Sequence, residues 1–163
     1  MSGSLRSSSL EGKWYAQGVR FSCTQCGNCC TGPPGFVWYS EDEGRAMAME
    51  LGVSDAEFKR RYTKKIGGRR SLDERLVEGL YDCVFLERHE DGRRTCSIYA
   101  VRPTQCRTWP VWESNLQSER HWNRAATTCP GMTMGGANRE GHVGQLITIE
   151  EIVERLDKNP KGL

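Results

Sequence analysis

The fold is decided by the stretch Phe21-Ser-Cys-Thr-Gln-Cys-Gly-Asn-Cys-Cys-Thr-Gly-Pro-Pro-Gly35. Four of the eight cysteines of the chain lie in it, at Cys23, Cys26, Cys29 and Cys30. Two cysteines separated by two residues can direct both sulfurs at one point, a spacing common in zinc sites, iron-sulfur loops and dithiol redox centres. Glycines and prolines close the stretch, which is typical of a loop. We therefore predict a ligand loop.

The neighbouring pair Cys29 and Cys30 argues against disulfides within this loop. Neighbouring Cα atoms lie ~3.8 Å apart across a trans peptide, whereas a disulfide needs roughly 4.4 to 6.8 Å between them. A bond between these two residues would be strained, so thiolates gathered around a metal use the loop better. A reducing compartment would also keep the thiols free. A disulfide framework is the alternative, because an export route is compatible with the sequence.

The content of large apolar residues is low for a chain of 163 residues, which is the size of one domain. Leu, Ile, Val and Phe together number 29. That share is about 18%, below the ~20% at which apolar burial alone becomes doubtful as a source of stability. The net charge of +2 argues against a self-repelling disordered chain. Structural metal sites contribute on the order of 10 kcal/mol to folding, so we expect bound metal to supplement a thin core.

Charge and hydropathy argue against several classes of partner. The segment Met1 to Ser9 is polar and has no apolar signal region, and no apolar run approaches the ~18 residues of a membrane helix. We expect a soluble, cytoplasmic protein without a membrane partner. The pI of about 8.1 is mild and no basic stripe with interleaved aromatic residues occurs, so we expect no nucleic-acid partner. The sequence does not identify a protein partner.

The predicted fold is a small single α+β domain with short strands and about three helices, organised around cysteine-ligated metal. Helices are expected where a capping Ser or Thr precedes Glu by three residues, over 40–51, 54–62 and 148–157, and in a short turn after Pro103. Short strands are expected over 13–21, 36–39, 83–86 and 95–99, with the last two forming a hairpin that brings Cys83 near Cys96. The basic stretch 63–70 is expected to be an exposed loop.

This pattern also predicts the domain organisation. Residues 1–12 are expected to form a disordered tail, residues 13–134 a cysteine-cluster metal-binding domain, and residues 135–163 an extension with one helix packing on that domain.

Motifs beyond the loop carry a resemblance to a known family. Cys83-x-Phe-Leu, Cys96-x-Ile-Tyr and Arg102-Pro-x-x-Cys106-Arg follow the loop in order. Together they resemble the YkgJ-like CxxCxxCC cysteine-cluster family, described as a zinc- or iron-chelating domain, over roughly residues 21–129. The resemblance implies metal ligation by Cys23, Cys26, Cys29, Cys30, Cys83, Cys96, Cys106 and Cys129, of which Cys129 lies outside the tightest motif. Arg102 and Arg107 are expected to donate hydrogen bonds or charge to thiolates or carbonyls beside the metal.

The metal stays open between zinc and an iron-sulfur cluster, in one or two sites. The spacing Cys23-x-x-Cys26-x-x-Cys29 repeats the start of a bacterial ferredoxin loop. Cys30 follows at once, however, where the ferredoxin run leaves three residues before its fourth cysteine. Eight thiols also divide into two closed four-thiolate zinc sites. The sequence does not group the sulfurs, and His121 is the best candidate outside the cysteines for a substitute ligand.

Three classes of function follow from these residues. The first is a metal-chelating or cluster-carrying protein whose site is mainly structural or electron-carrying, and it accounts for every cysteine. The second is an enzyme, either an iron-sulfur oxidoreductase or a protein-modifying enzyme related to flagellin lysine N-methylase, as the resemblance suggests. No radical-SAM spacing, nucleotide loop or catalytic residue supports an enzyme. The third is a dithiol switch at Cys23 and Cys26, whose sulfurs a metal would occupy.

Overall fold

Two units of helices and short strands make up the part of the chain that the computed structural model describes, residues 12–135 and 144–159. The first unit combines Met1–Thr24 with Thr108–Leu163, and the second is Gln25–Arg107. The predicted α+β class is confirmed, but the structure holds more helices than the three or so that we predicted. Apart from Gly12, the predicted tail lies outside the described residues. Within the described ranges, no helix is long and apolar enough to cross a membrane.

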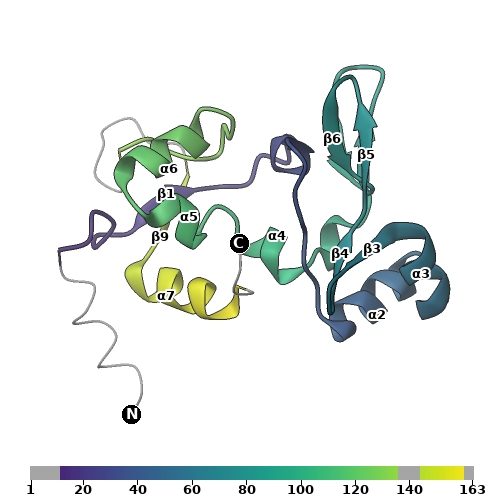
Figure 1. The fold of residues 1–163 in the computed structure, drawn as a ribbon. Helices are drawn as coiled ribbons and strands as arrows, with labels where there is room; N and C mark the ends of the chain where they lie inside the picture. The colour runs from purple at the N-terminus through teal and green to yellow at the C-terminus, as the bar shows by residue number, and fades with distance from the viewer. Residues whose placement is uncertain (1–11, 136–143, 160–163) are drawn as a thin grey trace, which may run out of the picture. The chain divides into compact units, whose positions relative to one another are not determined.

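The first unit is built on a short antiparallel strand pair. Its elements are β1 (Val19–Phe21), α5 (Glu113–Leu116), α6 (Glu119–Ala126), β9 (Gln145–Ile147) and α7 (Ile149–Lys158). Val19 pairs with Ile147, and both side chains are buried together with Trp122 of α6 and Ile152 of α7. Helices α5, α6 and α7 lie around the β1–β9 pair, as Figure 1 shows. The predicted helix over 148–157 is therefore present, and it begins at a capping box made by its Thr and Glu.

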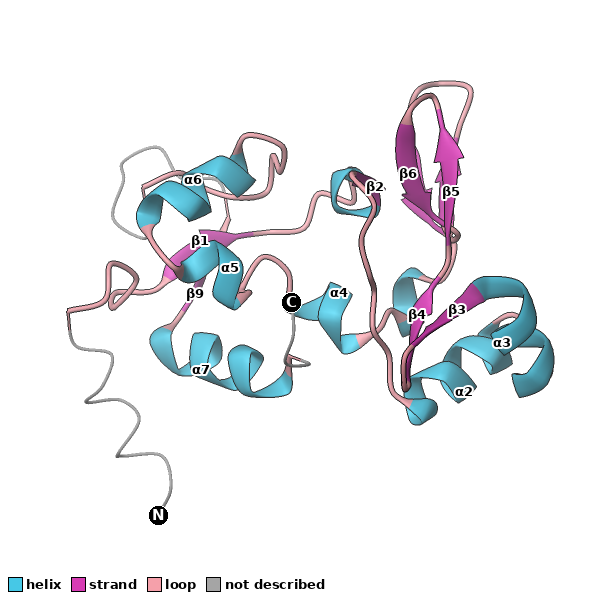
Figure 2. Ribbon diagram, viewed as in Figure 1, coloured by secondary structure: helices cyan, strands magenta, loops and turns pink. Residues whose placement is uncertain are grey.

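The second unit carries most of the cysteines. Its elements are η2 (Asn28–Cys30), β2 (Thr31–Gly32), α2 (Glu41–Glu50), α3 (Asp55–Tyr62), β3 (Thr63–Ile66), β4 (Arg69–Leu72), β5 (Glu74–Val77), β6 (Leu80–Cys83), β7 (Leu86–Arg88), β8 (Arg94–Cys96) and η3 (Tyr99–Val101), and α4 (Thr104–Thr108) ends at the boundary with the first unit. The strands form a three-stranded sheet in the order β2-β6-β5 and two hairpins, β3–β4 and β7–β8. In Figure 2, β2 lies beside β6 at the edge of this sheet.

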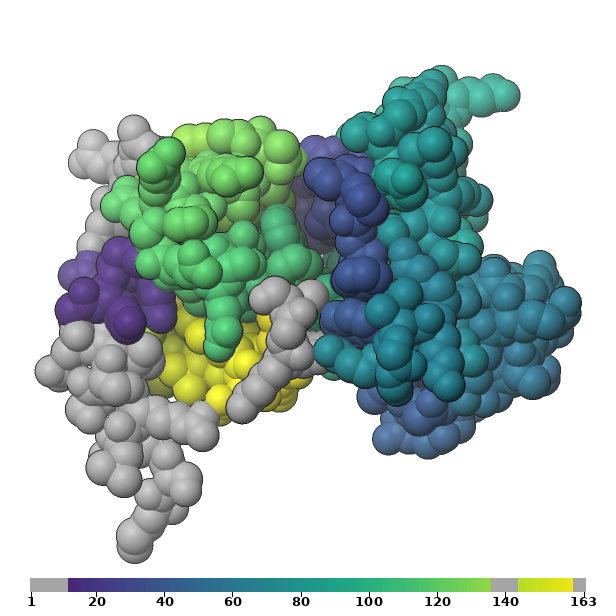
Figure 3. Space-filling model, in the orientation of Figure 1, coloured from purple at the N-terminus to yellow at the C-terminus, as the bar shows by residue number. Residues whose placement is uncertain are grey.

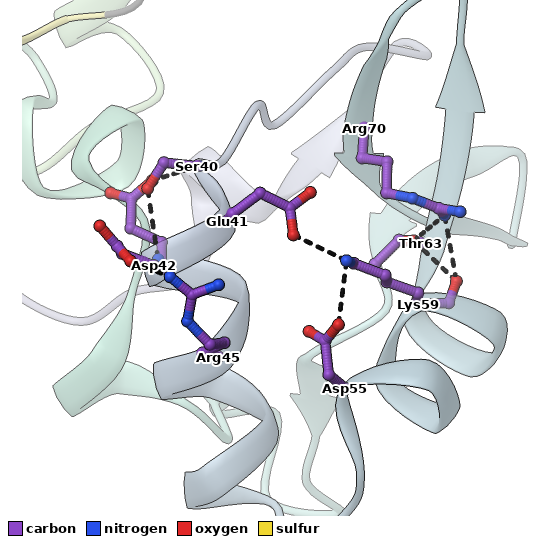
Figure 4. Close-up of polar contacts among 9 residues, drawn as sticks. Ser40, Glu41, Asp42, Arg45, Asp55, Lys59, Thr63 and Arg70 are labelled. Carbon is purple, nitrogen blue, oxygen red and sulfur yellow. Dashed lines mark hydrogen bonds and ion pairs between the residues drawn. The ribbon is translucent and has the colours of Figure 1, made fainter.

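Capping residues start the two long helices of the second unit where the sequence predicted them. Ser40 forms a full capping box at α2, and the Ser54 side chain accepts a hydrogen bond from the third residue of α3. Lys59 of α3 ties the two helix starts together, because its amine lies 2.7 Å from a Glu41 oxygen and 2.9 Å from an Asp55 oxygen (Figure 4). Because exposed ion pairs contribute about 0–1 kcal/mol each, these bonds orient the helices more than they stabilise them.

The core of the second unit supplies the stability that these ion pairs do not. Met47 of α2, Phe58 of α3, Leu72 of β4 and Phe85 are buried in one cluster with Ile98. The Phe58 and Phe85 rings are stacked with their centroids 6.4 Å apart. In the space-filling view the atoms of α2 and α3 lie against those of the strands that follow them (Figure 3). Burying a large apolar side chain contributes about 1.5–3 kcal/mol, so this cluster holds the helices on the strands.

Several strand predictions need correction. Residues 63–70, predicted as a loop, lie mostly in the β3–β4 hairpin, which turns at Gly67 and Gly68. A two-residue Gly-Gly turn is a hairpin signal, and it prevails over the basic charge that suggested a loop. The predicted strand over 13–21 is reduced to β1, and the stretch 36–39 makes only one bridge, between Trp38 and Ser71.

The predicted hairpin from Cys83 to Tyr99 also differs in its strands. Cys83 ends β6 and pairs with Glu74 of β5, while the hairpin β7–β8 pairs Leu86 with Cys96. The physical reason is a tight turn after β5, where Glu78 and Gly79 both have positive φ angles, 51° and 82°. Such a turn closes β5 onto β6 and takes Cys83 out of the later hairpin.

Candidate metal centre

The cysteine loop is packed against the β7–β8 hairpin. Gly27 has a φ of 71°, and its carbonyl accepts a 3.0 Å hydrogen bond from the amide of Cys30. A Cβ on Gly27 would lie 2.8 Å from the Cβ of Arg94 and 3.0 Å from a methyl group of Leu86. Arg94 also donates to the side-chain oxygen of Asn28. Only glycine fits here, and the close contact holds the loop on the hairpin that ends at Cys96.

Strand β2 then attaches the loop to β6. Thr31 follows Cys30 directly and pairs with Asp82, which precedes Cys83. The Asp82 carboxylate is only 1% exposed, and it accepts hydrogen bonds from the Thr31 hydroxyl at 2.5 Å and from Arg88 at 2.6 and 2.9 Å. The bonds from Arg88, with that from Thr31, lower the pKa of Asp82 although burial opposes them. Asp82 is therefore an ionised buried group that joins the loop, β6 and β7.

Helix α4 presents Cys106, and two side chains fix its start. Gln105 is 1% exposed; its amide nitrogen donates to the Phe36 carbonyl and its oxygen accepts from the Trp38 amide, both at 2.8 Å. Glu43 accepts a hydrogen bond of 2.6 Å from the backbone amide of Thr104. The sequence predicted a short helix after Pro103, and α4 confirms it.

The two arginines predicted to lie beside the metal take different positions. Arg102 donates to the Tyr99 carbonyl at 3.1 Å and its guanidinium lies 3.7 Å from the centre of the Tyr99 ring. Its charge acts to lower the pKa of the thiols at Cys29, Cys96 and Cys106. Arg102 is therefore within electrostatic reach of three sulfurs.

Arg107, in contrast, contacts side chains that hold α4. It donates to the Thr104 hydroxyl at 3.0 Å, and it lies 3.6 Å from a carboxylate oxygen of Glu43.

All eight cysteines carry free thiols. The sulfurs of the neighbouring pair lie 3.9 Å apart, at hydrogen-bonding distance. The hydrogen bond from Cys30 lowers the pKa of Cys29 to about 7, and the same bond, with burial, raises the pKa of Cys30. One thiol of the pair thus ionises near neutral pH while the other keeps its proton.

Five thiols influence one another's ionisation. Burial raises the pKa of Cys83 to about 11, and the charges of Cys96 and Cys29 add to the rise. Burial also raises the pKa of Cys106, and Cys83, Cys29 and Cys96 contribute again. Burial likewise raises the pKa of Cys96, and charges on Cys83 and Cys106 contribute to the raised pKa of Cys30. We call Cys29, Cys30, Cys83, Cys96 and Cys106 the five-thiol cluster.

The five-thiol cluster fits a metal ion in its chemistry. Among the described residues, no group of three or more Cys, His, Asp or Glu side chains has the arrangement that would hold a metal ion as it stands. The donors of the cluster are nevertheless all sulfur, which suits zinc and iron. A cation would reverse the raised thiol pKa values, because it deprotonates the thiols that it binds.

The other three predicted ligands are divided between the two units. Cys26 is partly exposed in the loop of the second unit, and Cys23 and Cys129 belong to the first. Cys129 is 8% exposed and packs in the apolar core of that unit. A hydrogen bond of 3.0 Å from the Ser22 amide to the Gly131 carbonyl places the segments of Cys23 and Cys129 side by side. His121 is hydrogen-bonded to Ser118 at the start of α6.

Sequence reasoning missed the residues that position the cysteines. Asp82 did carry a sequence signal. It is an acidic residue inside a short β-prone segment, directly before Cys83, and a carboxylate that becomes buried there needs a hydrogen-bonding partner. Gln105 lies inside the Arg102-Pro-x-x-Cys106 motif, yet its partners are backbone groups some 70 residues away in the chain, such as Phe36. No periodicity reveals such a contact.

Comparison with known proteins agrees with this chemistry. The family model CxxCxxCC, described as a "putative zinc- or iron-chelating domain", matches residues 22–130. A curated protein of Methanocaldococcus jannaschii, named only as an uncharacterized protein, is 30% identical over 96 residues, which are 59% of this chain and 47% of that protein. The chain thus spans about half the length of this curated relative. No solved structure matches the chain. Because the family model covers well over half of its residues, the chain belongs to the CxxCxxCC family of zinc- or iron-chelating domains.

Proposed function

We propose that this protein binds zinc or iron through the thiolates of the five-thiol cluster, and that the bound metal is mainly structural or electron-carrying. The observation that carries the proposal is that five cysteines of the family motif lie in one unit, where the Cys29 and Cys30 sulfurs are 3.9 Å apart and burial raises the pKa of the other three thiols. Buried thiols are costly to ionise unless a cation lies among them. A bound zinc ion or iron-sulfur centre supplies that positive charge.

A closed tetrahedral site needs four sulfur ligands. Three come from separate elements, Cys83 at the end of β6, Cys96 at the end of β8 and Cys106 in α4. The pair Cys29 and Cys30 supplies the fourth. Ligands that are distant in the sequence link the loop, β6, the β7–β8 hairpin and α4 through one ion, which stabilises a unit whose aliphatic core is small.

The remaining parts of the proposal rest on the family motif. Cys23, Cys26 and Cys129 belong to the proposed ligand set. Arg102 is proposed to stabilise the thiolates near it, and Arg107 to hold α4 through Glu43. We also propose a cytoplasmic setting, in which free thiols stay reduced. No observation on the described residues favours the oxidoreductase or methylase alternatives.

The test is purification without oxygen, followed by elemental analysis and an absorption spectrum of the parent protein and of single serine variants. Cys96→Ser and Cys106→Ser should each lose about one equivalent of metal, because each removes a ligand that a four-sulfur site needs. A brown protein that contains iron and sulfide identifies an iron-sulfur cluster, and a colourless protein that contains zinc identifies a four-thiolate zinc site. Full metal content in both Cys96→Ser and Cys106→Ser would contradict the proposal.

A further inference from the structure

Asp82 stands out among the buried groups that the ligand set does not use. Its carboxylate accepts three hydrogen bonds, one from the Thr31 hydroxyl and two from the Arg88 guanidinium. Its two donors come from different elements, Thr31 from β2 and Arg88 from β7. The Arg88 side chain is 32% exposed, whereas that of Asp82 is 1% exposed. The carboxylate is therefore the buried centre of a polar contact that joins three strands.

Each of these strands is adjacent to a member of the five-thiol cluster. Thr31 follows Cys30 and Asp82 precedes Cys83. Arg88 belongs to β7, whose first residue is paired with Cys96. The register Thr31↔Asp82 therefore sets how Cys30 faces Cys83, and the Arg88 contact sets where the Cys96 hairpin lies relative to both.

Strand β2 is too short to fix this register by backbone pairing. It has two residues, and only Thr31 and Gly32 pair with β6. A shift of one residue in a strand turns each side chain to the opposite face of the sheet. Such a shift would place a residue other than Thr31 opposite Asp82 and would move Cys30 along β6. The side-chain bond between Thr31 and Asp82 prevents the shift, because no other residue in register with Asp82 would offer it the same hydroxyl.

Stability alone is a poor explanation for the buried charge. The free energy lost when an ion pair is removed from water often equals the free energy gained from its attraction. Apolar residues of similar volume at the same place are frequently as stabilising as the ion pair. What a bidentate arginine and a hydroxyl supply that apolar residues lack is direction, since each hydrogen bond fixes an angle as well as a distance.

We infer that Asp82 is a positioning residue for metal binding, which with Thr31 and Arg88 holds Cys30, Cys83 and the Cys96 hairpin in the one register that allows their sulfurs to reach a shared metal ion. This inference rests on the function proposed above. Asp82 itself is not a ligand, because its oxygens are taken by Thr31 and Arg88.

The test uses cobalt(II) as the probe in the full-length, reduced protein. Asp82→Asn keeps the side-chain size but removes the charge and turns one acceptor into a donor. Groups that orient metal ligands typically change metal affinity about 10-fold to 100-fold, and we expect a loss of that size. Asp91→Asn is the matched control, because Asp91 also pairs with an arginine at 2.6 Å but lies exposed in the turn of the β7–β8 hairpin. It should bind cobalt as the parent does.

A second readout separates positioning from simple support of the fold. If Asp82 only stabilises the fold, the cobalt that still binds keeps the parent's absorption spectrum. If it positions the thiolates, the bound cobalt loses intensity in its sulfur charge-transfer and tetrahedral bands, because fewer sulfurs reach the ion. Thr31→Val removes only one of the three hydrogen bonds and should show the same spectral change to a smaller extent. It keeps the test valid if Asp82→Asn does not fold.

The outcomes distinguish this inference from the proposed function. A parent protein that binds no cobalt through sulfur overturns the proposed function itself. A parent that binds cobalt, with Thr31→Val and Asp82→Asn keeping its spectrum whatever their affinity, leaves that function standing and overturns the positioning role.

Discussion

Replacing Gly27 by alanine tests how the cysteine loop is held. Gly27 has a φ of 71°, and the left-handed conformation costs an L-residue about 1–2 kcal/mol. The new Cβ would also lie 2.8 Å from the Cβ of Arg94. Neither that atom nor the nearby Leu86 methyl is the free end of a long side chain, so the loop or the hairpin must shift, and such overpacking typically costs about 1–3 kcal/mol. We therefore expect Gly27→Ala to destabilise the metal-loaded protein by about 2–5 kcal/mol.

Gly92→Ala is a closely matched control. Gly92 has a φ of 84° in the turn of the β7–β8 hairpin, and a Cβ there would meet nothing within 4 Å. It should therefore show the conformational cost of about 1–2 kcal/mol without the overpacking. The difference between the two variants isolates the contact of the loop with the hairpin.

The assay is denaturant unfolding of both metal-loaded variants, together with chelator competition for the metal. Gly27→Ala should cost about 1–3 kcal/mol more than Gly92→Ala. If overpacking displaces the cysteine loop, this extra cost weakens metal binding of Gly27→Ala about 5-fold to 150-fold relative to Gly92→Ala. Equal losses of stability and equal metal affinities in the two variants would refute the packing of the loop on the hairpin.

Three further substitutions test the second unit. Glu43→Ala removes the acceptor for the Thr104 amide, and loss of a helix cap should cost about 0.5–2 kcal/mol at pH 7 in denaturant unfolding. Burial of Glu43 opposes its ionisation, but hydrogen bonds to its carboxylate lower its pKa overall. The loss of stability in Glu43→Ala should therefore be full above the unfolded carboxyl pKa near ~4.3. It should vanish as the pH falls through the lower pKa of the folded state. Gln105→Ala leaves the Trp38 amide and a carbonyl unpaired, which should cost about 1–3 kcal/mol for each buried group and weaken metal binding through α4. Phe58→Ala should cost about 3–5 kcal/mol in thermal or denaturant unfolding, because the ring is fully buried.

Controls for these variants come from the same helices. Glu50→Ala changes an exposed carboxylate at the other end of α2 and should alter stability by less than about 0.5 kcal/mol. Met49→Ala removes a side chain that is 81% exposed and should alter stability by less than about 0.5 kcal/mol. A Glu43→Ala effect that persists undiminished in acid would contradict the ionised cap, and a Phe58→Ala loss as small as that of Met49→Ala would contradict the core.

Helix starts and the ligand loop could be predicted from the sequence because their causes are local. A serine three residues before a glutamate satisfies the first amides of a helix wherever the rest of the chain lies, which is why α2 begins as predicted after Ser40. The α+β class followed from such signals and from short β-prone runs. The Gly67-Gly68 turn was also local, but its basic neighbours were given more weight than its backbone preference.

The grouping of the thiols could not be predicted, because non-local pairing decides it. Whether Cys83 joins the hairpin before it or after it depends on the turn at Glu78, and a positive φ at a glutamate has no sequence signal. The hydrogen bond from Thr31 to Asp82 joins residues that lie 51 positions apart in the chain. Such contacts are settled by three-dimensional packing, and a single sequence carries no record of them.

The most direct measurement is X-ray absorption at the metal edge of the full-length protein purified without oxygen, with the metal-to-protein ratio determined on the same sample. Thiolate coordination from the five-thiol cluster predicts a first shell of sulfur, with four neighbours at ~2.3 Å if the metal is zinc. A shell of nitrogen and oxygen around the bound metal, or a folded protein that takes up no metal at all, would contradict the account.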